Sequence, residues 1–188
     1  LDWCLAWPLP DNSDLHDVWV FSQSNVWAVG DHGRIRRFDG SDWTGADAGS
    51  PADFTDLWAA SAGDVWIAGD GVVARWHGAW ELHDAGVPLN AIWGTPSGQV
   101  WTGGLQGNLL VWNGLNWSAV DAGVSDDIVS GWASSDLDHW LATRSGLHHW
   151  NGAAWSHEQL DAGLARIRGR ASDDVWAVGA GGMVAHFD

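Results

Sequence analysis

The chain of 188 residues contains no lysine, and its eight cationic side chains are all arginines, set against 24 Asp and Glu residues. The formal net charge of −16 at pH 7 gives the surface a strongly negative field. Binding to nucleic acid depends on cationic side chains that neutralise phosphates, so we expect no nucleic-acid partner. An anionic membrane surface is disfavoured for the same reason.

Long apolar runs and paired cysteines are also missing. The longest apolar runs fall far short of the roughly 20 residues of a membrane-spanning helix, so we expect no membrane insertion. The single cysteine, Cys4, cannot form an internal disulfide and does not identify a compartment. Hydrophobic residues make up 46% of the chain, which is enough for one globular domain with a sizeable core.

A repeated unit dominates what is present. The triplet Asp-Ala-Gly recurs with spacings of 37, 37 and 40 residues, at Asp47, Asp84, Asp121 and Asp161. Each unit contains a Trp, a second Trp eight residues later, then an aromatic residue and a last Trp. The four complete sets are Trp19, Trp27, Phe38 and Trp43; Trp58, Trp66, Trp76 and Trp80; Trp93, Trp101, Trp112 and Trp117; and Trp132, Trp140, Trp150 and Trp155.

Each unit is expected to form four short antiparallel strands. Its runs are rich in Val, Ile, Trp and Leu and are separated by Gly, Asp, Asn and Ser, as in a β-meander. Pairs that tolerate positive φ predict hairpin turns between third and fourth strands, at Asp39-Gly40, His77-Gly78, Asn113-Gly114 and Asn151-Gly152. A sheet of this kind cannot bury both faces alone, so the units must stack, and a ring removes the exposed ends.

A fifth unit contains Arg168, Trp176 and Phe187 and then stops without its last Trp. At the other end of the chain, Trp3 follows an aspartate as Trp43 does. We therefore predict that residues 1–10 supply the fourth strand of the fifth sheet and close the ring.

The sequence resembles Trp-rich five-bladed β-propellers, on the evidence of this repeat and of phrases such as "DVWAVG" and "VWNG". It is similar in architecture to tachylectin-type lectins and to the "VWAVG" repeats of secreted bacterial proteins. The resemblance implies an all-β fold with four antiparallel strands per blade and a protein outside the cell or on its surface. The expected blades are 14–49, 50–86, 87–123, 124–163 and 164–188, with 1–10 as the closing strand.

The tryptophan columns divide into core and candidate ligand positions. The second-strand column is unbroken and the third-strand column is always aromatic, so both are expected in the core. The first-strand column is different, because Arg168 replaces Trp in the fifth blade, and an arginine there needs a partner or water. Its members are therefore candidate ligand-binding residues, with packing as the alternative: Trp19, Trp58, Trp93, Trp132 and Arg168.

The leading functional hypothesis is a non-enzymatic, multivalent carbohydrate-binding module with shallow sites between blades, where sugars stack on indole rings. The alternative is a structural or protein-interaction propeller that acts as an assembly unit. The sequence predicts no cofactor and no metal site, since its nine histidines show no spacing shared by the units. Only two glutamates are present, Glu81 and Glu158, both expected on outer strands, which disfavours glycosidase chemistry.

Two further expectations concern aspartates. Arg166, on an inner strand, is expected to form an ion pair with Asp17 of the adjoining first blade. The aspartates of the Asp-Ala-Gly triplets are expected to accept backbone hydrogen bonds in turns between units.

Overall fold

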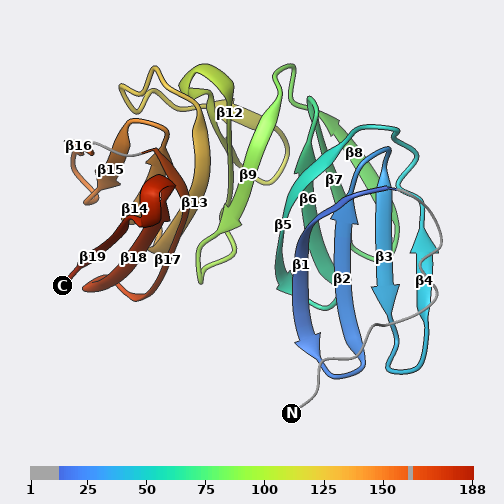
Figure 1. Ribbon diagram of the computed structural model, residues 1–188. Coiled ribbons are helices and arrows are strands. Elements are labelled where there is room, and N and C mark those ends of the chain that lie inside the picture. Colours follow the sequence, from blue (N-terminus) through green and yellow to red (C-terminus); the bar gives the residue numbers. More distant parts are fainter. Residues whose placement is uncertain (1–12, 161–162) are drawn as a thin grey trace, which may run out of the picture.

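A computed structural model describes residues 13–160 and 163–188, which form five antiparallel sheets (Figure 1). Blade 1 contains β1 (Leu15–Ser22), β2 (Asn25–Gly30), β3 (Arg34–Phe38) and β4 (Trp43–Ala46). Blade 2 contains β5 (Phe54–Ser61), β6 (Asp64–Gly69), β7 (Val72–Trp76) and β8 (Trp80–Asp84). Blade 3 contains β9 (Leu89–Gly94), β10 (Val100–Gly104), β11 (Leu109–Trp112) and β12 (Trp117–Ala119).

Blade 4 contains β13 (Ile128–Ser135), β14 (Asp138–Thr143), β15 (Gly146–Trp150) and β16 (Trp155–Gln159). Blade 5 contains β17 (Leu164–Ala171), β18 (Asp174–Gly179) and β19 (Val184–Phe187). Short 3₁₀ turns, η1 (Leu105–Gly107) and η2 (Ala180–Gly182), join the second and third strands of blades 3 and 5. In every sheet the strands pair in chain order, as the meander pattern predicts.

The turns follow from residues that tolerate unusual backbone angles. The four predicted hairpin glycines all have positive φ, at Gly40, Gly78, Gly114 and Gly152, which confirms those turns. The aspartates of the repeated triplet accept the N–H of the glycine two residues later, at distances of 2.7–2.9 Å for Asp47, Asp84 and Asp121. The expected turns are confirmed there, whereas Asp161 lies outside the described residues.

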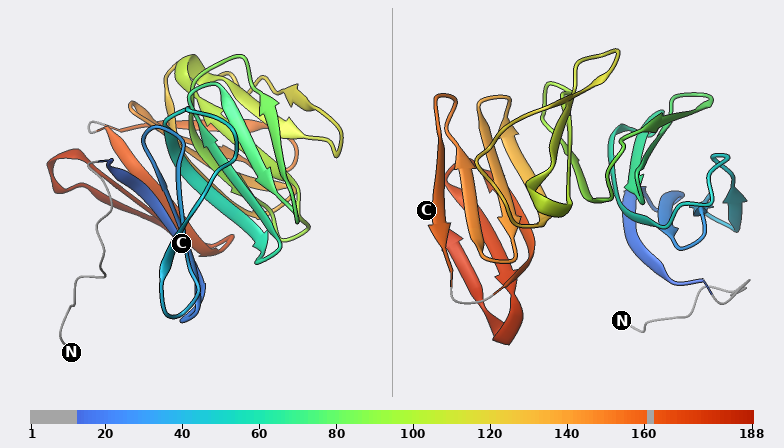
Figure 2. Two further views of the ribbon diagram at one scale, coloured as in Figure 1. Left: turned by 90° about the vertical axis from the view of Figure 1, so that its right-hand side faces the viewer. Right: turned by 90° about the horizontal axis from the view of Figure 1, so that it is seen from above.

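The five blades stand in chain order around an axis and form an arc. The first strands β1, β5, β9, β13 and β17 are the innermost, and each packs against the first strand of the next blade. Figures 1 and 2 show that the described residues leave the arc open between blade 1 and blade 5. Because residues 1–10 lie outside the described residues, the predicted closing strand stays a prediction.

The two sides of each blade have different neighbours. We call the side that faces the next blade along the chain the outgoing face, and the opposite side the incoming face. In blade 1 the outgoing face carries Trp19 and Trp27, because Trp27 contacts Trp76 and Trp80 of blade 2. Alternation along the strands places Phe38 and Trp43 on the incoming face.

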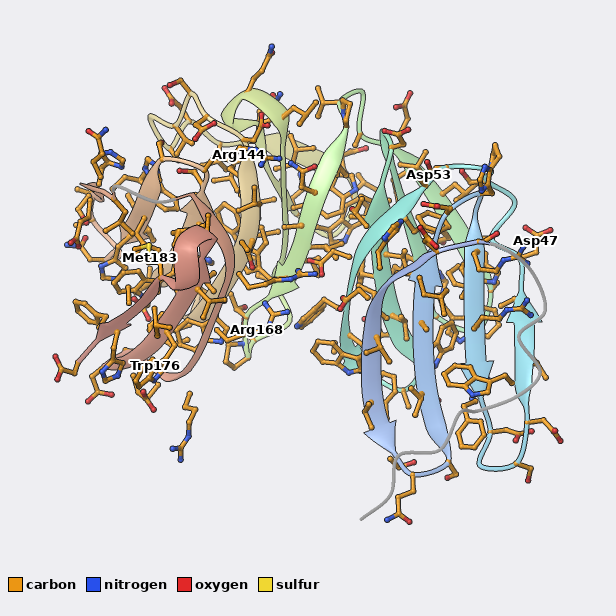
Figure 3. All side chains as sticks on the ribbon, in the orientation of Figure 1. Asp47, Asp53, Arg144, Arg168, Trp176 and Met183 are labelled. Atoms are coloured by element: carbon orange, nitrogen blue, oxygen red, sulfur yellow. The ribbon has the colours of Figure 1, made fainter. Side chains whose placement is uncertain are left out.

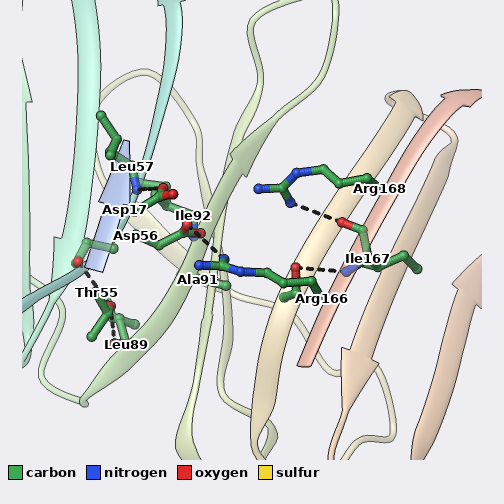
Figure 4. Close-up of polar contacts among 12 residues, drawn as sticks. Asp17, Thr55, Asp56, Leu57, Leu89, Ala91, Ile92, Arg166, Ile167 and Arg168 are labelled. Carbon is green, nitrogen blue, oxygen red and sulfur yellow. Dashed lines mark hydrogen bonds and ion pairs between the residues drawn. The ribbon is translucent and has the colours of Figure 1, made fainter. Parts of the chain in front are cut away.

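Side chains on the inner strands tie each blade to the next (Figure 4). The N–H of Leu57 in blade 2 donates to Asp17 of blade 1 at 3.0 Å, and the N–H of Ile92 in blade 3 donates to Asp56 of blade 2 at 2.8 Å. Ser130 of blade 4 accepts from the N–H of Ile167 in blade 5 at 3.3 Å. In blades 1, 2 and 4 this position of the repeat thus satisfies a backbone donor of the following blade, where sheet pairing cannot reach it. In blade 3 the position is held by Ala91, which has no side-chain acceptor.

Arg166 occupies this position in blade 5, and an arginine has no acceptor to offer. Its guanidinium reaches across the centre of the arc to Asp56 of blade 2, with the Nη1 and Oδ1 atoms 3.1 Å apart (Figure 4). The expected ion pair with Asp17 was therefore wrong, because Asp17 uses its carboxylate to accept from Leu57. The arginine instead links the last blade to the second.

Asp56 has an unusual proton affinity. Burial and, after it, the neighbouring Asp17 raise the pKa of Asp56 to about 7, although Arg166 opposes the shift. In an unfolded chain the carboxyl has a pKa of about 3.9. The folded protein therefore holds this proton more tightly than the unfolded chain does, and this contribution to stability is lost as pH rises from about 4 through about 7.

We expect Asp56→Asn to remove this part of the pH dependence of the free energy of unfolding. Asn keeps an oxygen that accepts from the N–H of Ile92 but does not titrate. Urea unfolding at a series of pH values should show the free energy of unfolding of the wild type falling relative to the variant between about pH 4 and pH 8. Parallel pH profiles for the two proteins would show that Asp56 is not the titrating group.

Candidate interaction surface

The structure places three of the predicted ligand-binding tryptophans in tight contact with the next blade. A side-chain carbon added at Gly94 would lie 2.2 Å from the Trp58 ring, one added at Gly131 would lie 2.3 Å from Trp93, and one added at Gly169 would lie 2.6 Å from Trp132. Each glycine belongs to the blade that follows its tryptophan. The indole rings are thus wedged between neighbouring first strands.

The first-strand tryptophans have correspondingly little exposure to solvent. Trp93 is only 3% exposed, and Trp19, Trp58 and Trp132 are partly buried against the hydrophobic clusters of their blades. A sugar that stacks on an indole needs a free ring face, and Trp93 offers none. The sequence signal for packing was the glycine in the first strand of the following blade. A glycine has no side chain there and so leaves space for the large indole ring.

Arg168, the fifth member of the set, is exposed. It lies directly across from Trp176 in the pairing of β17 with β18. Its guanidinium donates to the backbone carbonyl of Ile167 at 3.0 Å. The structure therefore brings Arg168 next to Trp176 and not next to the other four predicted site residues.

The second-strand tryptophans show how one blade holds the next. Trp66 of blade 2 packs edge-on against Trp112 and Trp117 of blade 3, with ring centroids 5.6 and 5.9 Å apart. Trp27 makes the corresponding contacts with Trp76 and Trp80, at 6.4 and 6.0 Å. In blades 2 and 3, an aromatic pair on the incoming face thus covers a tryptophan on the outgoing face of the blade before it.

A cation or imidazole from the third strand covers the other side of these tryptophans. The guanidinium of Arg75 lies 4.4 Å from the Trp66 ring centroid and is held by Asp64 at 2.9 Å. In blade 4, His149 stacks on Trp140 at 3.9 Å and is held by Asp138 at 2.6 Å. Trp140 also contacts Phe187 of blade 5, whose ring centroid is 4.7 Å away.

Trp176 of blade 5 also has an imidazole partner on the third strand of its own blade. His186 stacks on it at 3.9 Å, and Asp174 accepts both from the Trp176 indole N–H at 2.8 Å and from His186 at 3.1 Å. These two hydrogen bonds, with the charge of His186, hold the pKa of Asp174 below its usual value. The local geometry is therefore that of blade 4.

Trp176 is much more exposed to solvent than the corresponding tryptophans of blades 1, 2 and 4. The side chain is 47% exposed, whereas Trp27, Trp66 and Trp140 are 2%, 1% and 5% exposed. Val178 and Val184, which pair across β18 and β19, are exposed beside it. Figure 3 marks Trp176 on blade 5, at one end of the arc. We call the surface made by Arg168, Trp176, Val178, Val184 and His186 the end face.

The shared position of two histidines was missed in the sequence. His149 and His186 occupy the same place, directly across from the second-strand tryptophan, and Arg37 and Arg75 hold it in blades 1 and 2. The statement that histidines share no spacing was wrong for this pair. The signal was a cation or imidazole nine or ten residues after each second-strand Trp, broken only by Val111 in blade 3.

Other chemistry is sparse in the described part of the chain. Residues 13–160 and 163–188 contain no group of three or more His, Cys, Asp or Glu placed to hold a metal ion. Among the same residues no helix is long and apolar enough to cross a membrane. Glu81 and Glu158 lie on the fourth strands β8 and β16, as expected.

The contrast between wedged and exposed tryptophans gives a stability prediction. We expect Trp93→Ala to lower the free energy of unfolding by about 3–5 kcal/mol, because it leaves a cavity between blades 3 and 4. Trp176→Ala should lower it by about 1 kcal/mol or less, since half of that side chain is already in water. Urea unfolding of the two variants provides the comparison, and equal losses would contradict it.

Comparisons with known proteins bear on the fold. No family model matches the chain, and no curated protein matches it in sequence. Among solved structures, YCF48 bound to D1 peptide is similar with a TM-score of 0.76 and 16% identity, covering 97% of this chain and 66% of that one. The WD40 β-propeller domain of Doa1 is similar with a TM-score of 0.77 and 12% identity, covering 94% of this chain and 66% of that one. The chain thus spans just under two thirds of each of them, and it has a β-propeller fold.

Proposed function

We propose that the chain is a protein-interaction propeller that binds a partner protein through the end face. The observation that carries the proposal is the exposure of Trp176, whose counterparts in blades 1, 2 and 4 are buried by the following blade. The exposed apolar surface is contiguous, because Val178 and Val184 adjoin the indole. Such surfaces on soluble proteins commonly mark interaction sites.

The internal packing indicates what kind of partner fits. Trp140 is stacked on an imidazole of its own blade and also contacts an aromatic ring of the next blade. Trp176 has the imidazole but, among the described residues, no contact with an aromatic ring of a following blade, so the complementary group is an aromatic ring. Inside the chain this ring belongs to a β-hairpin with aromatic residues on both strands, such as Trp76 and Trp80. We therefore expect a partner that presents a β-sheet surface with an aromatic pair.

Charge adds a second element of recognition. The chain is strongly acidic, yet Arg168 lies beside Trp176 and Arg170 is 89% exposed on the same strand, 3.9 Å from Asp174. These two guanidinium groups form a local cationic edge on the apolar surface. A carboxylate next to the partner's aromatic pair would complement this edge and orient the complex.

Structural neighbours also support protein binding over sugar binding. YCF48, which resembles this chain in fold, has been solved with a peptide bound. The carbohydrate hypothesis depended on exposed first-strand indoles, and Trp58, Trp93 and Trp132 are instead wedged against glycines. No contact in the described residues favours a glycan over a protein as the ligand.

A direct test uses the hairpin that covers Trp27 inside the chain. A head-to-tail cyclised peptide containing residues 72–84, labelled with a dye, should bind the intact protein weakly, with a dissociation constant on the order of 0.1 mM. Trp176→Ala should weaken binding about 30-fold, as expected for an aromatic hot spot. Fluorescence anisotropy measures both affinities.

Matched controls make the result specific. A peptide with alanine at both tryptophan positions should not bind, and Leu115→Ala, which truncates an exposed apolar side chain on blade 3, should leave binding unchanged. If Trp176→Ala and the wild type bind the peptide equally, the end face is not the interaction surface.

A further inference from the structure

The joint between blades 3 and 4 contains a cavity with aromatic walls. It has a volume of about 230 Å³ and is lined by Trp101 of blade 3 and by Trp150 and Trp155 of blade 4. All three indoles are partly exposed, whereas Trp27 and Trp66, the counterparts of Trp101 in blades 1 and 2, are only 2% and 1% exposed. At the first two joints the second-strand tryptophan packs on the aromatic pair of the next blade, but at this joint a cavity lies between them.

Trp101 also lacks the cation that covers its counterparts. In blade 2 the guanidinium of Arg75 lies 4.4 Å from the Trp66 ring centroid, whereas Val111 stands directly across from Trp101. Gln99, which accepts from the Trp101 indole N–H at 2.8 Å, replaces the aspartate that holds the third-strand cation or imidazole in blades 2, 4 and 5. Blade 3 therefore supplies neither the cation nor the carboxylate that would hold it.

A neighbouring histidine does not replace this cation. His139 of blade 4 contacts Trp101 with ring centroids 4.6 Å apart. The histidine is only 1% exposed, and burial lowers its pKa, so the imidazole is neutral at pH 7. Among residues 13–160 and 163–188, no guanidinium lies over the Trp101 ring either. The negative face of this indole is thus available to a cation from outside the described residues.

A carboxylate lines the same cavity. Asp121, between β12 and β13, is exposed, and its Oδ1 atom accepts from the N–H of Gly123 at 2.9 Å. Several aromatic rings around a cavity are the arrangement by which proteins bind quaternary ammonium ligands, and a carboxylate adds a full negative charge to it. An apolar cavity of about 150 Å³ holds a benzene ring, and a trimethylammonium group is similar in size, so the space is sufficient.

We infer that this cavity binds a quaternary ammonium group, with its methyl groups against Trp101, Trp150 and Trp155 and with Asp121 beside them. The ligand supplies at this joint the cation that Arg75 supplies at the joint between blades 2 and 3. A primary ammonium has three N–H donors to satisfy, and Asp121 is the one side-chain acceptor among the described residues that line the cavity. A quaternary ammonium has no N–H donor and needs none. The site is separate from the end face and does not depend on partner binding there.

Choline and its uncharged analogue, in which a tert-butyl group replaces trimethylammonium, test the role of charge because the two have the same shape. We expect choline to shift the indole N–H resonances of the isotopically labelled intact chain, with a dissociation constant on the order of 1 mM. The analogue should bind at least about tenfold more weakly. Equal affinities for the two compounds overturn the inference, because the cavity would then select only apolar shape.

Asp121→Asn tests the carboxylate, because Asn keeps an oxygen for the N–H of Gly123 and loses the charge. Choline should bind about threefold to fivefold more weakly to this variant. Asp84→Asn makes the same change at the corresponding position of blade 2 and should leave the affinity unchanged. Equal losses in the two variants show an effect of net charge alone and overturn the assignment of the site.

Val111→Arg tests the aromatic walls without removing any of them. The new guanidinium should lie over Trp101 as that of Arg75 lies over Trp66, and choline affinity should fall about tenfold or more. Val111→Met, which adds a long side chain without charge, is the matched control and should bind choline nearly as the wild type does. Wild-type affinity in Val111→Arg overturns the inference.

Two probes identify the source of the ammonium group. Choline represents a free small molecule, and the amide of acetylated trimethyllysine represents a side chain of another protein. The probe that binds more tightly in the same titration of the intact chain identifies the source. Failure of both probes to shift any indole resonance at about 10 mM overturns the inference.

Discussion

The packing of one tryptophan between two layers holds this propeller together. In each of blades 1, 2 and 4, a second-strand tryptophan is covered on one side by a cation or imidazole of its own blade. Aromatic residues of the next blade contact the same tryptophan, and in blade 4 its two partners are His149 and Phe187. This contact links strand pairing within a blade to packing between blades. The cation or imidazole and the aromatic residues of the next blade both have fixed positions in the register of their hairpins. Blade order, blade spacing and the chemistry of the exposed end all follow from this contact.

Hydrogen bonds near the axis complement the aromatic packing at the rim. Asp17, Asp56 and Ser130 each accept a backbone N–H from the following blade, so the inner strands are linked where no sheet pairing exists. Arg166 takes this position in the last blade and turns toward Asp56. Because a guanidinium cannot accept, blade 5 offers its successor no such bond. Ala91 holds this position in blade 3 and has no side-chain acceptor either, so Arg166 is distinguished by its charge and by its contact with Asp56.

Repetition made most of the fold predictable. Spacing of the tryptophans predicted the strands, their order and the hairpin turns, and the positive φ of Gly40 and Gly152 agrees with the turn residues chosen there. The sequence could not predict the partner of Arg166, because residues in one column share a place within the blade but not a neighbour across the axis. Trp176 was assigned to the core for a related reason. The sequence predicted a closed ring, in which blade 1 would cover the tryptophan of blade 5, whereas the described residues form an open arc.

The candidate site was harder to predict than the fold. First-strand tryptophans appeared suited to ligand binding because Arg168 interrupts the column, but Gly94, Gly131 and Gly169 show that the column packs against the backbone of the next blade. The complementary glycines belong to the following units. The pairing of Trp with Gly is therefore visible only when the first strands of neighbouring repeats are compared. The same comparison identifies the end face, where Trp176 and His186 repeat a buried arrangement on the surface.

The central claim is that Trp176 presents a free ring face in the isolated protein. Hydroxyl-radical footprinting of the native chain, with oxidation of each tryptophan measured by mass spectrometry, tests it most directly. The account predicts that Trp176 is oxidised several times faster than Trp27, Trp66 and Trp140. Protection of Trp176 equal to that of these three buried tryptophans would contradict it, because the end face would then be covered within the chain itself.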